Sequence, residues 1–206
     1  MIAALFIDSK RGPYPQFEGV ECWDEARDAR LYAGPHPVVA HPPCARWCRL
    51  AKQLEAMHGL KVGDDGGCFE AALRAVRTYG GVLEHPAHSI AWDWFGLPKP
   101  AGGSWCRALD GSWVVEVDQV HFGHQMNKPT WLYAYRCTAL PSMPTHKKRG
   151  THVMGRPSAQ RKTKEQRPPI SEPLIHLTPQ PFADLLVQIA RSARCYLPQG
   201  AINIVA

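Results

Sequence analysis

The chain contains 206 residues, 24 of them Lys or Arg and 18 Asp or Glu, which gives a formal charge of +6 at pH 7. This length fits one domain, and the 45% of hydrophobic residues excludes a disordered or fibrous chain. No apolar run approaches the roughly 20 residues that cross a bilayer, and Met1 to Asp8 is too short for a signal peptide, so we expect a cytoplasmic protein without a membrane partner. The positive charge favours a polyanionic partner.

The seven cysteines are scattered without the spacing of a disulfide scaffold, which favours reduced thiols. His85 and His88 invite comparison with zinc sites in which Cys44 and Cys48 are the sulfur ligands. Their spacing matches no common zinc pattern, so we predict no metal.

The chain begins with the apolar run Ile2 to Ile7, which predicts a first strand that ends at Asp8. The next stretch, Val20 to Asp24, is consistent with a second strand. It is also consistent with the start of a helix, because Asp24 to Arg30 alternates charges at helical spacing. The sequence leaves both alternatives open.

A third strand, Val38 to Ala40, runs directly into the loop His41-Pro42-Pro43-Cys44. The two prolines end the strand and restrict the loop, which places Cys44 at the carboxyl edge of the sheet, where open α/β sheets bind their ligands. Alternatively, Cys44 is a small buried hydrophobe. Its neighbours favour an active-site loop, because positive charge stabilises a thiolate and an aromatic ring stacks on a planar substrate. The neighbours that we select as candidate substrate residues are His41, Arg46 and Trp47.

Two helices are predicted next. The segment Cys48 to His58 has apolar residues at helical spacing, and Phe69, Leu73 and Val76 form the buried stripe of a second helix. The glycine-rich link between them, residues 63–67, lacks the lysine and the hydroxyl residue of a phosphate-binding loop. We therefore interpret it as a turn.

The following strand, Gly81 to Leu83, ends in Glu84-His85-Pro86, again with a polar side chain and a proline at a carboxyl edge. Strand, cysteine loop, helices and strand form a βαβ unit, whose right-handed crossover sets the two loops side by side. We therefore expect Cys44 and Glu84 to face one crevice, with Glu84 as an acid or base. The alternative for Glu84 is a capping or ion-pairing role.

An aromatic stretch from Trp92 to Trp113 follows, whose rings either stack on bases or pack a small core. The segments Val114 to Val120 and Thr130 to Tyr135 then have the pattern of two strands. The short connection between them predicts a β-hairpin.

Three motifs in this order resemble the DNA cytosine-5 methyltransferases, especially the compact members found in phage genomes. His41-Pro42-Pro43-Cys44 resembles the Pro-Pro-Cys loop of that family, and Leu83-Glu84-His85-Pro86 resembles its Glu-Asn-Val or Glu-Asn-Pro loop. Residues 122–128, Phe-Gly-His-Gln-Met-Asn-Lys, resemble its Tyr-Gly-x-x-Gln-x-Arg segment. The resemblance covers residues 37–135, and the three motifs together are more specific than any one of them.

The resemblance implies a DNA-modifying enzyme in which Cys44 attacks carbon 6 of a flipped cytosine. It implies that Glu84 holds the base at N3. By the same resemblance, Gln125 and Lys128 position the extruded nucleotide.

The resemblance also implies S-adenosylmethionine as the methyl donor, with Asp8, Gly12 and Asp28 as candidate cofactor residues and His85 as a further candidate at the DNA. The Phe-x-Gly-x-Gly loop of the family is missing, because residues 5–12 keep the strand and only one usable glycine. Two alternatives therefore stay open. One is a catalytically silent nucleic-acid-binding homologue, and the other is an enzyme with the same pocket and different base chemistry, such as excision or transfer of another group.

Basic residues are concentrated in residues 136–167 among prolines and glycines, without apolar periodicity. This composition predicts a segment that is disordered unless bound, and it corresponds to the target-recognition region of the family. It is either a solubilising loop or a loop that neutralises DNA phosphates. The residues that we select as DNA contacts are Lys147, Lys148, Arg149, Arg161, Lys162 and Lys164.

The last predicted helix follows Pro181, with Phe182, Leu185, Leu186 and Ile189 on one face. We therefore predict an α/β fold, namely a three-layer, Rossmann-like, mainly parallel sheet with a basic, loop-rich insertion. Residues 1–135 form its catalytic core, residues 136–170 the basic segment, and residues 171–206 a C-terminal helix and tail that pack back on the core.

Overall fold

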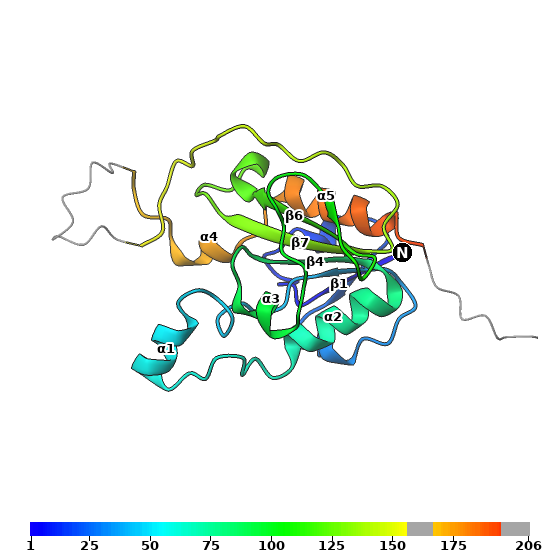
Figure 1. The fold of residues 1–206 in the computed structure, drawn as a ribbon, viewed down its shortest axis with the longest axis horizontal. Coiled ribbons are helices and arrows are strands. Elements are labelled where there is room, and N and C mark those ends of the chain that lie inside the picture. Colours follow the sequence, from blue (N-terminus) through cyan, green and yellow to red (C-terminus); the bar gives the residue numbers. More distant parts are fainter. Residues whose placement is uncertain (156–166, 195–206) are drawn as a thin grey trace, which may run out of the picture.

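The structure, a computed structural model, describes residues 1–155 and 167–194. Its centre is a mixed seven-stranded sheet with the order β2-β1-β3-β4-β7-β6-β5 (Figure 1). The strands are β1 (Ile2–Leu5), β2 (Val20–Trp23), β3 (Val38–Ala40), β4 (Gly81–Pro86), β5 (Cys106–Arg107), β6 (Trp113–Asp118) and β7 (Pro129–Tyr135). The predicted α/β class is therefore confirmed.

Helices and 3-10 turns connect the strands. The α-helices are α1 (Ala51–His58), α2 (Cys68–Tyr79), α3 (Ile90–Trp94), α4 (Glu172–His176) and α5 (Gln180–Arg191). The 3-10 turns are η1 (Tyr14–Gln16), η2 (Ala29–Leu31) and η3 (Gln119–Phe122). Among the described residues, no helix is both long and apolar enough to cross a membrane.

The sheet is half parallel and half antiparallel, which corrects the expectation of a mainly parallel sheet. Strands β2, β1, β3 and β4 pair in parallel, whereas β4 with β7, β7 with β6 and β6 with β5 pair antiparallel. The cause is the predicted hairpin, which is confirmed as β6 and β7: a short connection permits only antiparallel pairing. Because β7 inserts between β4 and β6, it adds a second antiparallel pair.

The predicted βαβ unit is confirmed and sets the geometry of the two loops. Strands β3 and β4 are parallel neighbours, with Ala40 opposite Leu83. The residues that follow them in the sequence, His41 and Glu84, therefore lie at the same edge of the sheet. This register brings the cysteine loop and the glutamate loop together.

The ambiguous stretch after Val20 is a strand and not an α-helix. The charged residues that follow form only the short turn η2, because acidic side chains bind nearby backbone groups. Asp24 accepts from the Arg27 amide, and Asp28, with φ of 51°, accepts from the Arg30 amide. Such local hydrogen bonds compete with a helix.

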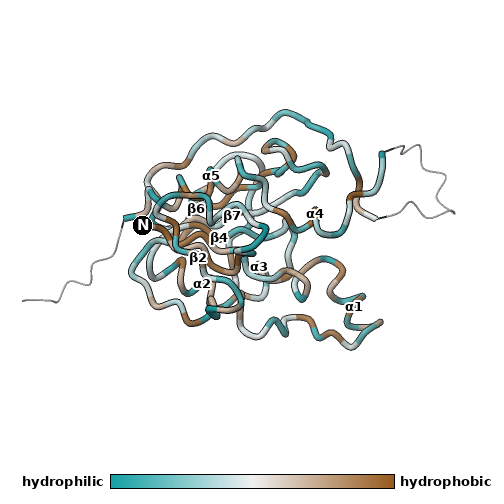
Figure 2. Tube along the Cα trace, turned by 180° about the vertical axis from the view of Figure 1, so that it is seen from behind, coloured by the Kyte–Doolittle hydropathy of each residue, from teal (hydrophilic) through white to brown (hydrophobic). Residues whose placement is uncertain are grey.

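Apolar side chains cover both faces of the sheet. Along β3, Val38 and Ala40 belong to one buried cluster together with Phe69 of α2, whereas Val39 belongs to a second cluster together with Phe182 of α5. Figure 2 shows apolar residues along the strands between these helices. The predicted stripes of α2 and α5 are thus buried against opposite faces, with Leu185 of α5 only partly covered.

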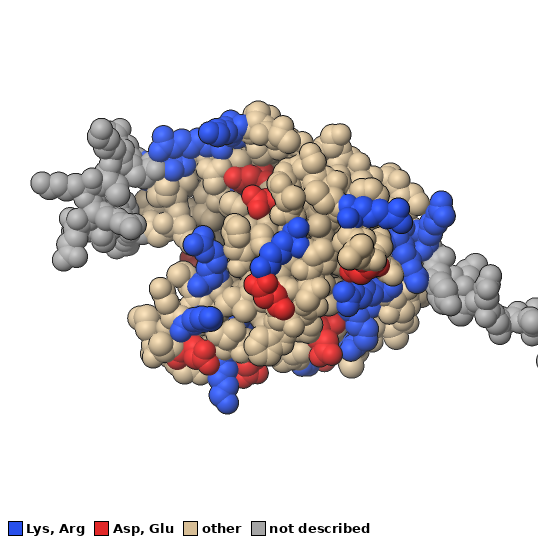
Figure 3. All heavy atoms as spheres, viewed as in Figure 1, with Lys and Arg blue, Asp and Glu red and all other residues tan. Residues whose placement is uncertain are grey.

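Helix α1 projects from the rest of the molecule (Figure 1), and Ala51 is its only fully buried residue. It starts three residues later than its predicted beginning at Cys48, because Cys44 to Leu50 form turns. Figure 3 shows the outline of the molecule indented between α1 and α4.

The described part of the basic segment is held against the core. Met143 is buried, and the backbone of Gly150 lies against Gln125 and Met126. The prediction of a segment disordered unless bound is therefore wrong for this part, because backbone hydrogen bonds anchor it. The candidates Arg161, Lys162 and Lys164 lie outside the described residues.

The close approach of β3 and β4 yields a stability prediction. At Gly81, with φ of +123°, a Cβ would lie 2.0 Å from the Val38 carbonyl oxygen. Gly81→Ala should therefore lower the free energy of unfolding by more than about 3 kcal/mol, measured by urea denaturation. The matched control is Gly59→Ala, also at positive φ but with nothing within 4 Å, which should cost only about 1–2 kcal/mol. Equal losses in both variants would contradict the predicted backbone collision.

Candidate active site

A buried hydrogen-bond chain joins Glu84 to Tyr14 through His41. The Glu84 Oε2 atom lies 2.8 Å from His41 Nδ1, and His41 Nε2 lies 2.5 Å from the Tyr14 hydroxyl oxygen. A carboxylate has no proton to donate, so Nδ1 carries the hydrogen. In the neutral ring, Nε2 then accepts from the Tyr14 hydroxyl.

A second set of partners occupies the other oxygen of Glu84. Gln119 donates from Nε2 to Glu84 Oε1 at 3.0 Å and to the Thr130 hydroxyl at 3.0 Å. The Thr130 hydroxyl in turn donates to the Lys128 carbonyl at 3.0 Å. The Oε1 atom of Gln119 is buried and has no hydrogen-bond partner among the described residues.

Glu84 is ionised at neutral pH. Burial by itself raises the Glu84 pKa, but the hydrogen bond from His41 and the charges of His41 and Lys128 outweigh burial and lower the pKa to about 2. Burial and the nearby charges of Glu84 and Cys22 raise the pKa of Tyr14 well above its usual value. The hydrogen-bond chain therefore has an ionised carboxylate, Glu84, at one end and a protonated phenol, Tyr14, at the other, with the His41 imidazole between them.

Cys44 lies close enough to Glu84 and Lys128 to respond to both charges. Burial and the charge of Glu84 raise the pKa of the Cys44 thiol, whereas Lys128 lowers it. The Cys44 carbonyl accepts from the amides of Trp47 and Cys48 at 2.9 Å each, which fixes the turn that presents the thiol. Cys44 therefore lies within range of the Glu84 charge, and the raised pKa keeps the resting sulfur a protonated thiol.

Two of the candidate substrate residues are core residues. Trp47 is 2% exposed, donates from Nε1 to Asp65 at 2.8 Å and packs against Phe69, so it has no face for a substrate. His85 is 1% exposed and stacks on Trp92. Their assignment to the substrate surface is wrong, because each side chain points into the sheet face that α2 covers.

The lysine of the third motif influences the candidate site, but the glutamine of that motif does not. Lys128 influences Cys44 and Glu84, as described above. Gln125 is exposed, and its carbonyl accepts from the His152 amide at 3.0 Å. The glutamine that contacts Glu84 is Gln119. Its signal in the sequence is a polar residue immediately after the strand that ends at Asp118, the same signal that identified Glu84.

Tyr14 and Thr130 are the other residues that the sequence analysis missed. Tyr14 belongs to the proline-flanked turn η1, and Thr130 is the second residue of β7. Neither position carries a motif. Arg46 is half-buried near Cys44, and its carbonyl accepts from the Gly63 amide at 3.1 Å.

A cavity of about 670 Å³ lies at the carboxyl ends of β1 and β2. Phe6, Asp24, Glu25, Asp28 and Pro43 are among its lining residues. Phe6 adopts φ of 59°, a strained conformation for an aromatic residue, and such strain is common at functional sites.

Only one of the three candidate cofactor residues lines this cavity, namely Asp28. The Asp8 carboxylate binds the amides of Lys10 and Arg11 and pairs with the Arg11 guanidinium at 2.8 Å, so it stabilises its own turn. Gly12 packs against the Asp8 carbonyl. No group of three or more metal-binding side chains occurs in the described ranges.

Comparison of this chain with protein-family models, curated proteins and solved structures finds no match.

The buried His85 predicts a pH dependence of stability. Burial lowers the His85 pKa from 6.5 to about 4. Between pH 6.5 and pH 4 the unfolded chain therefore binds a proton that the folded chain does not. The free energy of unfolding should decrease as the pH is lowered through this window, by up to about 3 kcal/mol. His85→Phe, which keeps a ring against Trp92, should remove this loss in urea denaturation at a series of pH values.

The matched control is His58→Phe, which makes the same substitution at an exposed position at the end of α1. An unaltered slope in His85→Phe would contradict the prediction.

Proposed function

We propose that this chain is a DNA-modifying enzyme in which Cys44 adds to carbon 6 of an extruded pyrimidine, most simply cytosine. The observation that carries the proposal is the hydrogen bond of Glu84 with His41 at the edge where the loop of Cys44 leaves β3, within range of the charges of Glu84 and Lys128 on the thiol. As part of this proposal, the sheet with α2 and α5 on opposite faces is a reduced Rossmann-like, three-layer fold. The motif resemblance supplies the substrate class, and the shared edge of β3 and β4 supports the chemistry.

Attack on carbon 6 needs balanced proton movement. The sulfur forms a bond to carbon 6, the electron pair of the ring double bond moves to carbon 5, and the ring gains a proton at N3. The thiol releases one proton to solvent, so no net proton is consumed. Because the Glu84 pKa is about 2, the carboxylate holds no proton at rest and passes to N3 only a proton that it takes from His41 Nδ1 in the same step. It orients N3–H and stabilises the positive charge that develops there.

The chain Glu84–His41–Tyr14 is the path that we propose for this proton. His41 donates from Nδ1 to Glu84, and the Tyr14 hydroxyl, 2.5 Å from Nε2, fixes the orientation of its ring. Gln119 holds the other carboxylate oxygen in position, because its Nε2 donates to Glu84 Oε1 at 3.0 Å. In the proposed enzyme Lys128 lowers the thiol pKa, which favours the attacking thiolate.

The cavity beside β1 and β2 is the place that we propose for S-adenosylmethionine, which is cationic and has ribose hydroxyl groups. The Asp28 carboxylate is paired with Arg30 at 2.7 Å, and the remaining lining includes the carboxylates of Asp24 and Glu25 and the ring of Phe6. These residues would hold the hydroxyls and the positive charge, and the bound donor supplies the methyl group for carbon 5. Pro43 lines the same cavity and is the neighbour of Cys44 in the chain.

The proposal predicts a covalent adduct. A duplex that contains 5-fluorocytosine, incubated with S-adenosylmethionine, should form a denaturation-resistant complex, because fluorine at carbon 5 prevents the final elimination. Mass spectrometry should locate the bond at Cys44. Cys44→Ser should abolish the adduct, and Cys106→Ser, a half-buried cysteine on the edge strand β5, should leave it unchanged.

Absence of a Cys44-dependent adduct with both 5-fluorocytosine and 5-fluorouracil duplexes would contradict the proposed attack. Retained duplex binding in the same samples would then favour the silent nucleic-acid-binding alternative.

The proton path predicts a specific kinetic defect. His41→Gln removes the proton donor to Glu84 and should slow adduct formation by about 10²–10⁴-fold. Tyr14→Phe keeps the ring but not the hydroxyl, and should slow the step by about tenfold. Single-turnover rates measure both effects. A wild-type rate in His41→Gln would contradict the proton path, but not the attack by Cys44.

A further inference from the structure

Cys44 and Cys48 lie at the two ends of one turn of chain. The Cys44 carbonyl accepts from the Cys48 amide at 2.9 Å, which closes a single helical turn ahead of α1. Both thiols are half-buried and free. No other two cysteines are this close in the sequence, because the next pair, Cys48 and Cys68, is 20 positions apart.

The geometry of this turn brings the two sulfur atoms toward each other. Residues one helical turn apart project from the same side, with about 5–6 Å between their Cβ atoms. The Cys48 sulfur donates to the Ala45 carbonyl at 3.7 Å, so it points back toward the start of the turn, where Cys44 lies. A disulfide needs about 3.5–4.5 Å between the Cβ atoms, so the turn has to tighten by about 1–2 Å. Because the turn lies between β3 and α1, this movement disturbs no regular element.

The core fixes the middle of the turn. Trp47 is buried, its Nε1 donates to Asp65, and its carbonyl accepts from the Ile90 amide at 2.8 Å. The Arg46 carbonyl accepts from the Gly63 amide at 3.1 Å. These two fixed residues between the cysteines keep the thiols from separating, and groups that are held at short range react far faster than the same groups free in solution.

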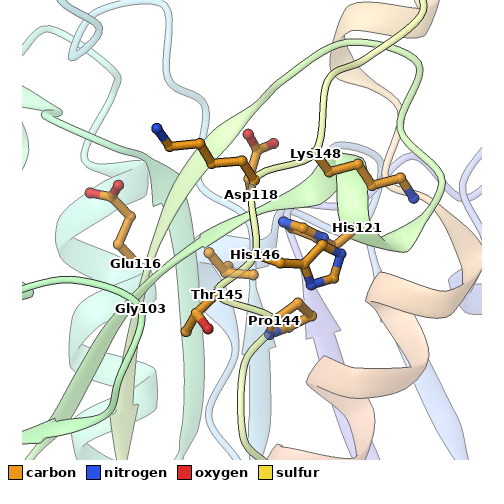
Figure 4. A pocket seen from close by; sticks show the side chains of 10 residues that line it. Gly103, Glu116, Asp118, His121, Pro144, Thr145, His146 and Lys148 are labelled. Carbon is orange, nitrogen blue, oxygen red and sulfur yellow. The ribbon is translucent and has the colours of Figure 1, made fainter.

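The remaining described cysteines lie on other elements. They are Cys22 on β2, Cys68 at the start of α2, Cys106 on β5 and Cys137 after β7. Strands β2 and β5 form opposite edges of the sheet, and Cys137 is buried. A second cavity, of about 480 Å³ beside β6 and η3, has no cysteine among the described residues that line it (Figure 4). Cys48 is therefore the thiol that the fold places beside Cys44.

We propose that Cys44 and Cys48 form a reversible disulfide when a peroxide oxidises the chain, and that this bond is a redox switch of the candidate active site. Cys48 is oxidised first, because its hydrogen bond lies on the exposed side of the turn, whereas Cys44 is held as the less reactive protonated thiol. The disulfide then removes the nucleophile. That consequence, though not the bond itself, rests on the proposed function.

The oxidation is balanced in two steps. The Cys48 sulfur attacks one oxygen of hydrogen peroxide and becomes a sulfenic acid, while the O–O bond breaks and the other oxygen leaves as hydroxide, which takes the thiol proton and becomes water. The Cys44 sulfur then attacks the Cys48 sulfur, the S–O bond breaks, and hydroxide leaves with the Cys44 proton as a second water. The two sulfur atoms lose two electrons in total, which the peroxide gains.

The shape of the turn favours a bond that is easily reduced. Tightening a turn whose middle is anchored stores strain, and strained or exposed disulfides are reduced more readily than structural ones. Disulfides of this kind are typical of redox sensing in reducing compartments. A thiol reductant should therefore restore both thiols.

Hydrogen peroxide tests the bond without DNA. The oxidised full chain, alkylated and digested with trypsin without reduction, should yield residues 31–46 linked to residues 47–49, because trypsin cleaves after Arg46, between the two cysteines. Dithiothreitol should separate the two peptides. Cys48→Ser should abolish the linked pair, and Cys68→Ser should retain it. Absence of the linked pair in the wild type, or linkage of Cys44 to another cysteine, would overturn the proposal.

The adduct assay tests the switch. A peroxide dose that forms the bond should slow adduct formation with the 5-fluorocytosine duplex by more than about tenfold in the wild type, and dithiothreitol should restore the rate. Cys48→Ser should form the adduct at the wild-type rate when reduced, and should lose less than about twofold at the same dose, because protonated Cys44 resists oxidation. Equal losses in both proteins would show that Cys44 is oxidised without Cys48 and would overturn the switch. Unchanged melting temperatures show that the variant folds.

The disulfide and the proposed chemistry can fail separately. Linked peptides without any Cys44 adduct would support the disulfide and contradict the attack on the base. An adduct without linked peptides would do the reverse.

Discussion

The pairing of His41 with Glu84 is the interaction on which the candidate site depends. It follows from the register of β3 and β4, in which Ala40 lies opposite Leu83. Only this register places the first residue after β3 beside Glu84. The glycine at position 81 permits that register, since a side chain there would collide with Val38. A residue without a side chain at one end of the strands thus allows the side-chain pairing at the other.

A buried carboxylate is costly unless its oxygens are bonded, and Glu84 obtains its partners from distant parts of the chain. His41 follows β3, Gln119 belongs to η3 and Lys128 precedes β7. Residues from both the parallel and the antiparallel half of the sheet therefore stabilise this one carboxylate. Loss of a single partner leaves a buried charge uncompensated, which costs about 3–5 kcal/mol, so stability and the proposed activity depend on the same contacts.

Periodicity in the sequence was sufficient for the main elements of the fold. The strands at Val38 and Gly81 and the stripe led by Phe69 were predicted because burial on a sheet face leaves a repeating apolar pattern. The meeting of Cys44 and Glu84 followed from the βαβ crossover. Trp47 was misjudged because a loop residue carries no period that shows which way its ring points. For the same reason, the sequence indicates Gln125, although Gln119 is the glutamine that contacts Glu84.

The charges around Cys44 suggest how the thiol is protected at rest. Burial and Glu84 hold the sulfur in its protonated form, which is the less reactive and less oxidisable form. The charge of Lys128 has the opposite effect and lowers the pKa of the thiol. A pyrimidine that engages Glu84 through N3–H would reduce the influence of that carboxylate on the thiol, and Lys128 would then dominate. In the proposed enzyme, substrate binding itself would therefore activate the nucleophile, and an empty pocket would keep it inert.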